Sequence, residues 1–322
     1  MKKLMNDPEN IVTAFLDGLV AANGERLQRL EGTDVITRRS FKPQKVGIVS
    51  GGGSGHEPAH AGYVGEGMLD AAVAGEVFTS PGADQFLAAI QAADQGAGVL
   101  VLVKNYNGDV MNVEMAQEMA EAEGITAEMV IINDDVAVDD PEQRRGIAGT
   151  VLVQKMTGAF AETGASLSEV KRLAEKAVSR VRSMSVALTP CTLPAVDQPS
   201  FDLAEEEMEV GIGIHGERGM DRREVASSAE IARLLLDHIL PEIPQGAPLA
   251  VLVNGMGSTS LMELQVFAND VIEQLDRDIQ HTFVGEYMTS LDMAGVSLTL
   301  LALDDELAEH LQAPVKTVQW KQ

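Results

Sequence analysis

The stretch VGIVSGGGSGHEP, residues 46–58, decides the fold of this chain, because a short apolar run leads directly into a cluster of glycines. Two further apolar runs, VLVLVKNY at 99–106 and EMVIIND at 128–134, follow segments with helical patterning near 83–94 and 112–123. Short strands that are apolar throughout are typically covered on both faces of a sheet. Strand, loop and helix repeated in this way predict an α/β layer with a largely parallel sheet.

The second half of the chain repeats this alternation of strands and helices. Strands are predicted at 209–216, 249–255, 283–288 and 297–303, and helices near 222–239 and 260–276, with further helices at 8–30 and 168–182. Pro190, Pro194 and Pro199 exclude regular structure between 187 and 200. We therefore predict an α/β protein of two domains, 1–185 and 186–322, each with a β-sheet flanked by helices.

Composition and charge exclude several classes of function. The chain has 322 residues, 45% of them hydrophobic, and its 24 basic and 49 acidic residues give a net charge of 24 − 49 = −25. A protein of this charge is repelled by nucleic acids and by anionic membranes. The acidity has two interpretations, a surface that favours solubility and an adaptation to high salt. Lysine supplies only 10 of the 24 basic residues, which favours the second.

Cysteine content and hydropathy indicate the cellular compartment of the protein. A single cysteine, Cys191, excludes an internal disulfide and a thiolate metal cluster. No apolar run reaches the length of about 18 residues that a membrane helix needs. The first ten residues, MKKLMNDPEN, lack the apolar stretch of a signal peptide. We therefore expect a cytoplasmic protein.

The glycine cluster SGGGSGHEP, residues 50–58, is the first candidate site. Glycines allow the backbone to approach a ligand closely, and successive N–H groups can hold oxygen atoms. The alternative is a tight connection between a strand and a helix that binds nothing. His56 favours a ligand site, since open α/β sheets bind ligands where strands end. No Gly-Lys-Ser/Thr follows, so the cluster is not a nucleotide P-loop.

The segment KNYNGD, residues 104–109, follows the next strand and adds Lys104 and Asp109 to the same edge of the sheet. A lysine donor, a carboxylate and His56 in one crevice can hold and deprotonate a small polyol. The alternative is an ordinary Asn/Gly turn in which Asp109 caps a helix.

Three other segments also contain histidines or glycines. His215 in GIGIHGE, residues 211–217, is a candidate nucleophile or base at a glycine-flanked strand end, or alternatively a structural histidine. The turn NGMGSTS, 254–260, is expected to cap a helix rather than to bind a ligand. His60 has helical metal spacing from His56, but without a third ligand we predict no metal site.

At these motifs the sequence resembles the dihydroxyacetone kinase family, specifically its substrate-binding (K-type) subunit, over nearly the whole chain. The matching segments are SGGGSGHEP (50–58), GEVFTSP (75–81), KNYNGD (104–109), DDVAV (134–138), RRGIAGTVLVQKMTGAFAETG (144–164), EMEVGIGIHGE (207–217) and TSLDMAGVSLTLL (289–301).

The resemblance implies a kinase subunit that binds dihydroxyacetone covalently, as a hemiaminal on His215. It implies that His56 or Asp109 takes the proton from the hydroxyl that attacks phosphorus. The residues that match the family's substrate-binding positions are Gly53, Ser54, Gly55, His56, Lys104 and Asp109.

The resemblance also implies that the phosphoryl donor is bound elsewhere. In the family the nucleotide lies in a separate helical domain or subunit, so we expect no cofactor in this chain and ATP, or ADP, with Mg on a partner. The donor is then ATP or the sugar phosphotransferase system. A homodimer is expected from the family alone. Two departures are Arg218 in place of a usual proline and a shorter segment near 235–250.

Two other functions stay open. A regulatory paralogue that senses a small carbonyl compound needs capture of the ligand but no catalytic base, so His56, Lys104, Asp109 and His215 together favour a kinase subunit. A self-sufficient ATP kinase is disfavoured, because the chain contains no motif for nucleotide phosphates.

Overall fold

The computed structural model describes residues 3–196 and 198–320, and they form two compact units. Unit 1 contains the described residues of 1–132, 152–176 and 309–322, and unit 2 those of 133–151 and 177–308. The chain therefore passes between the units several times, whereas the sequence predicts a single crossing at 185/186. Two α/β units, each with a sheet and flanking helices, confirm the predicted fold class.

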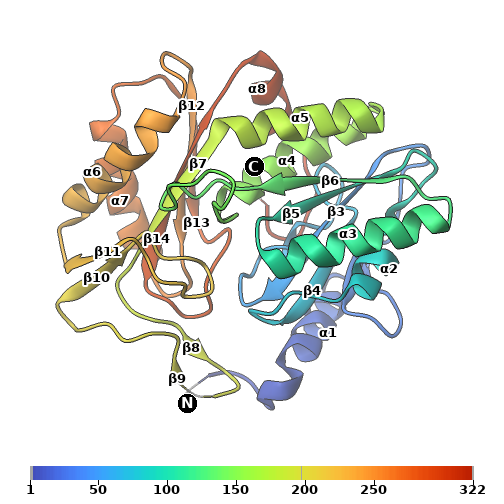
Figure 1. Cartoon of the computed structure of the whole chain (residues 1–322), viewed down its shortest axis with the longest axis horizontal. Coiled ribbons are helices and arrows are strands. Elements are labelled where there is room, and N and C mark those ends of the chain that lie inside the picture. The colour runs from blue at the N-terminus through green and yellow to red at the C-terminus, as the bar shows by residue number, and fades with distance from the viewer. Residues whose placement is uncertain (1–2, 197, 321–322) are drawn as a thin grey trace. The chain divides into compact units, whose positions relative to one another are not determined.

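Unit 1 is built on a six-stranded sheet in the order β1-β2-β4-β3-β5-β6, of which Figure 1 labels β3, β4, β5 and β6. Its strands are β1 (Leu27–Arg29), β2 (Val35–Arg38), β3 (Gly47–Ser54), β4 (Ala71–Val77), β5 (Val99–Lys104) and β6 (Ala127–Ile132). Strands β4, β3, β5 and β6 run parallel, while β1 and β2 form an antiparallel extension. The N-terminal sheet is thus largely parallel, as predicted.

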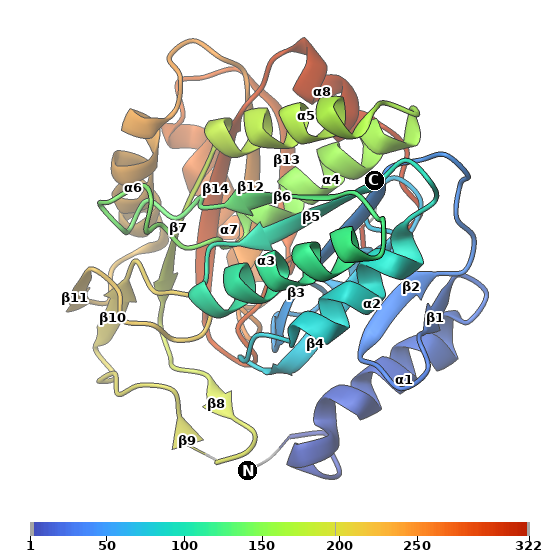
Figure 2. The same ribbon diagram turned by 45° about the vertical axis from the view of Figure 1, so that its right-hand side comes forward.

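Helices cover both faces of this sheet. They are α1 (Ile11–Asn23), α2 (Ala83–Ala93) and α3 (Asn107–Ala122), with the short 3-10 helices η1 (Pro8–Asn10) and η2 (Ala61–Tyr63). Figure 2 shows α2 and α3 side by side; α2 packs on β2, β4, β3 and β5, and α3 packs on β5 and β6. Successive residues of β3 face opposite sides of the sheet. Gly51 faces Phe86 of α2, and Ser50 bonds Gln154 of α4 (Gly149–Glu162).

Unit 2 has a mixed sheet in the order β11-β10-β7-β14-β12-β13, in which β12 and β13 pair in parallel and the other pairs are antiparallel. Its strands are β7 (Val181–Ala187), β10 (Glu207–Val210), β11 (Asp221–Glu224), β12 (Leu249–Gly255), β13 (Ile279–Gly285) and β14 (Gly295–Ala302). The helices are α6 (Ser228–Ile239), η3 (Leu240–Glu242) and α7 (Leu261–Gln274), and a small ribbon joins β8 (Thr192–Leu193) to β9 (Gln198–Pro199). Helices α5 (Leu167–Arg180) and α8 (Asp305–Gln312) contain residues of both units.

Several predicted boundaries were wrong, and local chemistry explains them. The helix predicted at 8–30 ends at Asn23, and β1 begins at Leu27. The helix predicted at 168–182 ends at Arg180, and β7 follows at once. The helix predicted at 222–239 begins only at Ser228. Ser227 and Glu230 form a capping box there, which fixes the start.

The strand predicted at 209–216 ends at Val210, because Gly211 has φ +74° and leaves the extended conformation. The proline segment 187–200 contains the two-residue strands β8 and β9 rather than no regular structure. Among residues 3–196 and 198–320, every helix is too short or too polar to span a membrane.

Candidate functional site

The glycine cluster of unit 1 lies inside a strand rather than in a loop. β3 continues through Ser54, and the backbone turns only at Gly55, where φ is +103°. Glycine is required at Gly51 because a Cβ there would lie 2.7 Å from the carbonyl oxygen of Val73. The predicted loop that cradles a ligand is thus a close-packed strand whose last residues reach the edge of the sheet.

Gly52 makes room for the side chain of Lys104. A Cβ on Gly52 would overlap Nζ of Lys104 and lie 3.5 Å from Oδ2 of Asp109, and φ at Gly52 is +149°. Lys104 ends β5 and is fully buried, and its Nζ donates to the carbonyl oxygen of Gly51 over 3.3 Å. The missing side chain at Gly52 therefore gives the ammonium a place beside the β3 backbone.

Asp109 lies in the first turn of α3, next to this ammonium. Its Oδ2 is 4.0 Å from Nζ of Lys104, and its side chain is almost completely buried. Its Oδ1 has no hydrogen-bond partner among the described residues. The N-cap position of α3 is Tyr106, so Asp109 does not occupy the capping position that the alternative interpretation required. A buried carboxylate with an unused acceptor is suited to receive a hydroxyl proton.

His56 is buried after the turn at Gly55 and stacks on Phe78, with ring centroids 5.2 Å apart and planes inclined by 16°. Phe78 holds its ring there with φ +56°, which few residues with side chains adopt. The structure thus places His56, Lys104 and Asp109 in the same unit, on elements that end or begin at one edge of the sheet.

The remaining predicted residues of this segment have backbone roles as well. Ser54 donates its hydroxyl to the carbonyl oxygen of Gly75 over 2.7 Å, which ties β3 to β4. The N–H of Gly55 donates to the carboxylate of Glu57. Burial raises the pKa of Glu57, and the hydrogen bond from Gly55 opposes this shift.

His60, which the sequence placed only in a rejected metal pair, contacts Lys104 directly. Its Nε2 lies 3.1 Å from Nζ of Lys104, and its Nδ1 lies 2.7 Å from the amide of Gln154. Burial lowers the pKa of His60 well below 6.5, the charge of Lys104 lowers it further, and the bond with Gln154 opposes both. His60 is therefore a neutral imidazole. The only signal for His60 in the sequence was its spacing of four residues from His56, which does not indicate a contact with Lys104.

His215 belongs to unit 2 and follows β10 in a glycine turn. Glu217 binds it twice: Oε1 lies 2.7 Å from Nδ1 of His215, and Oε2 accepts the backbone N–H of His215 over 2.9 Å. Burial of Glu217 raises its pKa, but the hydrogen bonds and charge of His215 outweigh this and lower the pKa to about 2. An ionised Glu217 accepts Nδ1–H and so places the ring's lone pair on Nε2.

Two glycines and an arginine hold the His215 turn in place. A Cβ on Gly213 would overlap Oε2 of Glu217, so glycine is required there. Gly216 has φ +81°, a conformation that favours glycine. Arg145 donates to the carbonyl oxygen of Gly211 over 2.8 Å and pairs with the buried Asp135. The turn that carries His215 is therefore fixed by these contacts, and 18% of the His215 side chain is exposed.

The other candidates have structural roles. In the turn 254–260, Ser260 and Glu263 form a capping box at the start of α7, which confirms the expected cap. Cys191 is buried, and burial raises its thiol pKa. The described residues contain no group of three His, Cys, Asp or Glu side chains arranged to bind a metal.

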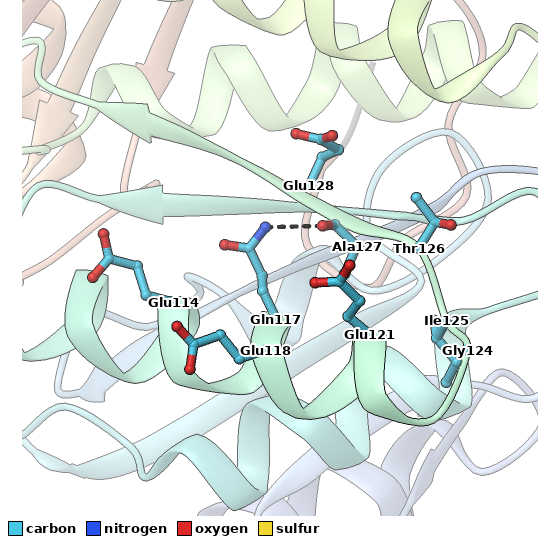
Figure 3. A pocket seen from close by; sticks show the side chains of 9 residues that line it. All are labelled: Glu114, Gln117, Glu118, Glu121, Gly124, Ile125, Thr126, Ala127 and Glu128. Carbon is cyan, nitrogen blue, oxygen red and sulfur yellow. Dashed lines mark hydrogen bonds between the residues drawn. The ribbon is translucent and has the colours of Figure 1, made fainter.

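A hollow of about 660 Å³ lies elsewhere in unit 1, between α3 and β6. Figure 3 shows the carboxylates of Glu114, Glu118 and Glu121 along α3, with Glu128 on β6. Gln117 joins the two elements by donating to the carbonyl oxygen of Ala127 over 2.9 Å. Such an acidic lining disfavours an anionic substrate or a phosphate. Despite its size, this hollow does not contain the predicted site residues.

Comparison with known proteins assigns the family. The family model described as the Dak1 domain matches residues 17–319. The chain belongs to the Dak1 family. This confirms the resemblance stated from the motifs.

Individual relatives match over nearly the whole chain. The PTS-dependent dihydroxyacetone kinase 1, dihydroxyacetone-binding subunit DhaK, of Listeria innocua is 54% identical over 99% of this chain and 100% of its own length. The solved dihydroxyacetone kinase of C. freundii in complex with AMP-PNP and Mg²⁺ has a TM-score of 0.93 and 39% identity. That match covers 99% of this chain but 60% of that protein.

A third Dak1 relative has a different role. The dihydroxyacetone kinase operon co-activator Dha-DhaQ has a TM-score of 0.91 and 38% identity, over 95% of this chain and 97% of its own. Membership of the Dak1 family is therefore compatible with catalysis and with regulation, and the site residues must decide between them.

Proposed function

We propose that this chain is the dihydroxyacetone-binding subunit of a multi-component dihydroxyacetone kinase. The observation that carries the proposal is the His215–Glu217 pair, a histidine whose nucleophilic nitrogen is selected by a carboxylate, in a chain 54% identical to a dihydroxyacetone-binding subunit. The chain holds the ketone, and a separate subunit supplies the phosphoryl group. The product is dihydroxyacetone phosphate.

The ketone is captured as a hemiaminal on His215. The lone pair on Nε2 forms a bond to the carbonyl carbon, and the π electrons of the carbonyl move to its oxygen. That oxygen gains one proton and the ring gives up one from Nδ1 through solvent, so the adduct has the mass of protein plus ketone. Glu217 stabilises the positive charge on the ring while the bond forms. Glycerol has similar hydroxyls but no carbonyl, so it forms no adduct.

The residues of unit 1 bind and activate substrate hydroxyls. Lys104 donates a hydrogen bond to one hydroxyl, together with backbone groups of Gly53 and Gly55 and the side chain of Ser54. Asp109 accepts the proton of the hydroxyl that attacks phosphorus, and His56 assists as the second acid–base group. The buried position of Asp109, with Oδ2 4.0 Å from Nζ of Lys104 and Oδ1 without a hydrogen-bond partner among the described residues, supports this role.

The phosphoryl donor is bound on a partner chain. We expect that partner to carry ATP, or ADP recharged by the sugar phosphotransferase system, with Mg²⁺. The solved C. freundii kinase, which binds AMP-PNP and Mg²⁺, is longer than the part that this chain matches, and this supports a nucleotide site outside the present chain. The L. innocua relative named as PTS-dependent favours the phosphotransferase donor. A homodimer of this chain is part of the same proposal.

A small-carbonyl co-activator is the second candidate, since a structural relative has that role. Such a protein needs ligand capture but no proton acceptor. Asp109 and His56 are both present and buried in this chain, which favours catalysis.

Intact-protein mass spectrometry after incubation with dihydroxyacetone and rapid gel filtration tests the capture. We expect a gain of one substrate molecule on the native chain and none on His215→Ala or with glycerol. A folded native chain without adduct would overturn the covalent step. Adding a purified nucleotide-carrying subunit and its phosphoryl donor then tests catalysis. Capture without turnover in the presence of an active partner would favour the co-activator.

A further inference from the structure

We infer that His60 is a positioning residue that holds the ammonium of Lys104 at the hydroxyl-binding site, and that Gln154 sets the tautomer in which it does so. The inference rests on the proposed function, because it assumes that Lys104 binds substrate. All of the residues involved belong to unit 1.

The contact between His60 and Lys104 permits only one assignment of protons. A lysine ammonium has three donors and no acceptor. Its Nζ lies 3.1 Å from Nε2 of His60, so Nε2 must carry the lone pair. In a neutral imidazole the proton is then on Nδ1.

This tautomer determines how the amide of Gln154 is turned. The amide lies 2.7 Å from Nδ1 of His60, and a protonated Nδ1 needs an oxygen acceptor there. The oxygen and nitrogen of an amide are assigned from such networks. With the nitrogen facing His60, Oε1 of Gln154 is buried without a hydrogen-bond partner in the described structure. Turning the amide gives Oε1 the proton of Nδ1 as its partner.

Hydrogen bonds connect this network to the β-sheet, and they fix the position of the His60 ring. With the amide turned, Oε1 of Gln154 lies 2.9 Å from the Ser50 hydroxyl and accepts its single proton, which goes to Oε1 instead of to the carbonyl oxygen of Leu102 at 2.7 Å. Strands β3 and β5, which present Gly51 and Lys104, are therefore linked to α4 through this cluster. The ammonium is held beside Gly51 and 4.0 Å from Asp109.

His60 acts through Lys104 and not on the substrate itself. Its Nε2 faces the ammonium of Lys104 and its Nδ1 faces the amide of Gln154, so both ring nitrogens are engaged by protein groups. The burial and the neighbouring cation also keep the ring neutral, which it must be to accept from Lys104.

Binding of dihydroxyacetone, measured as adduct against substrate concentration, tests the inference in four variants. His60→Leu removes the acceptor, and we expect binding to weaken by about tenfold or more, the effect of losing a hydrogen bond to a charged group. His60→Gln keeps an acceptor oxygen and should restore most of the affinity. His310→Leu, which removes another buried histidine of unit 1, should leave binding unchanged.

Lys104→Met separates failure of the inference from failure of the proposed function. If Lys104→Met binds normally, the proposed role of Lys104 is wrong. If it binds weakly, His60→Leu should add little in that background, since the two residues act as one unit. Additive losses, or a folded His60→Leu that binds like the native chain, would overturn the positioning role.

The tautomer can be read from the native protein even if His60→Leu does not fold. Nitrogen-15 NMR of the ring should show a protonated Nδ1 and an unprotonated Nε2 at neutral pH. The opposite tautomer, or an imidazolium, would overturn the inference.

Discussion

The carboxylate of Glu217 binds His215 at two points, one oxygen 2.7 Å from the ring Nδ1 and the other 2.9 Å from the backbone nitrogen. The side chain that orients the imidazole therefore also fixes the backbone that carries it. Gly213 makes this possible, because any side chain there would displace the carboxylate. In a Gly-Ile-His-Gly-Glu turn, the glutamate two residues after the histidine is thus as much part of the site as the histidine.

Replacing Glu217 should slow capture of the ketone without abolishing it. Glu217→Gln keeps an acceptor for Nδ1–H but loses the charge that stabilises the adduct, and Glu217→Ala loses both. We expect Glu217→Ala to slow adduct formation by about 10- to 100-fold, consistent with losing a hydrogen bond to a charged group, and Glu217→Gln to fall between it and the native chain. Adduct mass against time measures the rates.

Glu263→Gln is the matched control, because Glu263 lies in the same unit and only caps α7. Its rate should equal that of the native chain. The pKa of Glu217 is about 2, so Glu217 itself stays ionised from pH 5 to pH 9. Equal rates for Glu217→Ala and the native chain would show that Glu217 has no role in capture.

Asp109→Asn should keep the adduct and lose turnover. The substitution preserves shape but removes the proton acceptor, so phosphoryl transfer with an added partner should slow by about 10²- to 10⁴-fold. Asp84→Asn, in the first turn of α2 and exposed, is the control and should have native turnover. Native turnover by Asp109→Asn would remove Asp109 from the mechanism and leave His56 as the base.

Sequence patterns predicted the strands that are long apolar runs and missed others. In unit 1, β3, β5 and β6 were found, but the central strand β4, AAVAGEV, was missed. In unit 2, β7, VRSMSVA, was missed: Arg182 fell in the helix predicted at 168–182, and Ser183 and Ser185 were assigned to no element. Its buried serines are satisfied only by distant partners: Ser183 bonds Thr299, and Ser185 donates to the carbonyl oxygen of Ile212. Such pairing depends on the tertiary fold and leaves no local signal.

The candidate site shows the same division. His56, Lys104, Asp109 and His215 were found because each stands at the end of an apolar strand or among glycines. The role of His60 was missed, because its partners Lys104 and Gln154 lie 44 and 94 residues away in the sequence. A short-range pattern can suggest a metal pair with His56 but cannot indicate a buried hydrogen-bond network.

Gly52→Ala should impair binding and stability together. The new Cβ would overlap Nζ of Lys104, and φ at this position is +149°. We expect the ammonium to be displaced, adduct formation to need a higher dihydroxyacetone concentration, and the free energy of unfolding to fall by about 1–3 kcal/mol. Urea unfolding and adduct titration measure the two effects.

Gly18→Ala is the control for this substitution. Gly18 lies within α1, a Cβ added there would meet no described atom within 4 Å, and alanine favours helix. Its binding should be native and its stability equal or higher. Native binding by Gly52→Ala would mean that the space at Gly52 does not determine where Lys104 lies.

The neutral state of His60 predicts how stability depends on pH. Burial and the charge of Lys104 lower the pKa of His60 well below 6.5 in the folded protein, so the unfolded chain binds the extra proton as pH falls below 6.5. The stability that His60 contributes is therefore fully present above pH 6.5. It is lost progressively as the pH falls from 6.5 toward the folded-state pKa, by up to about 1.4 kcal/mol per pH unit.

His60→Gln cannot titrate, so its stability should fall less than that of the native chain between pH 6.5 and 5. The carboxylates are the same in the native chain and in His60→Gln. The difference between the urea-unfolding free energies of the two proteins therefore reports the titration of His60. We expect that difference to be constant from pH 8 to 7 and to shrink below pH 6.5. A difference that stays constant down to pH 5 would mean that His60 takes up a proton in the folded state, and a charged imidazole cannot accept a hydrogen bond from Lys104.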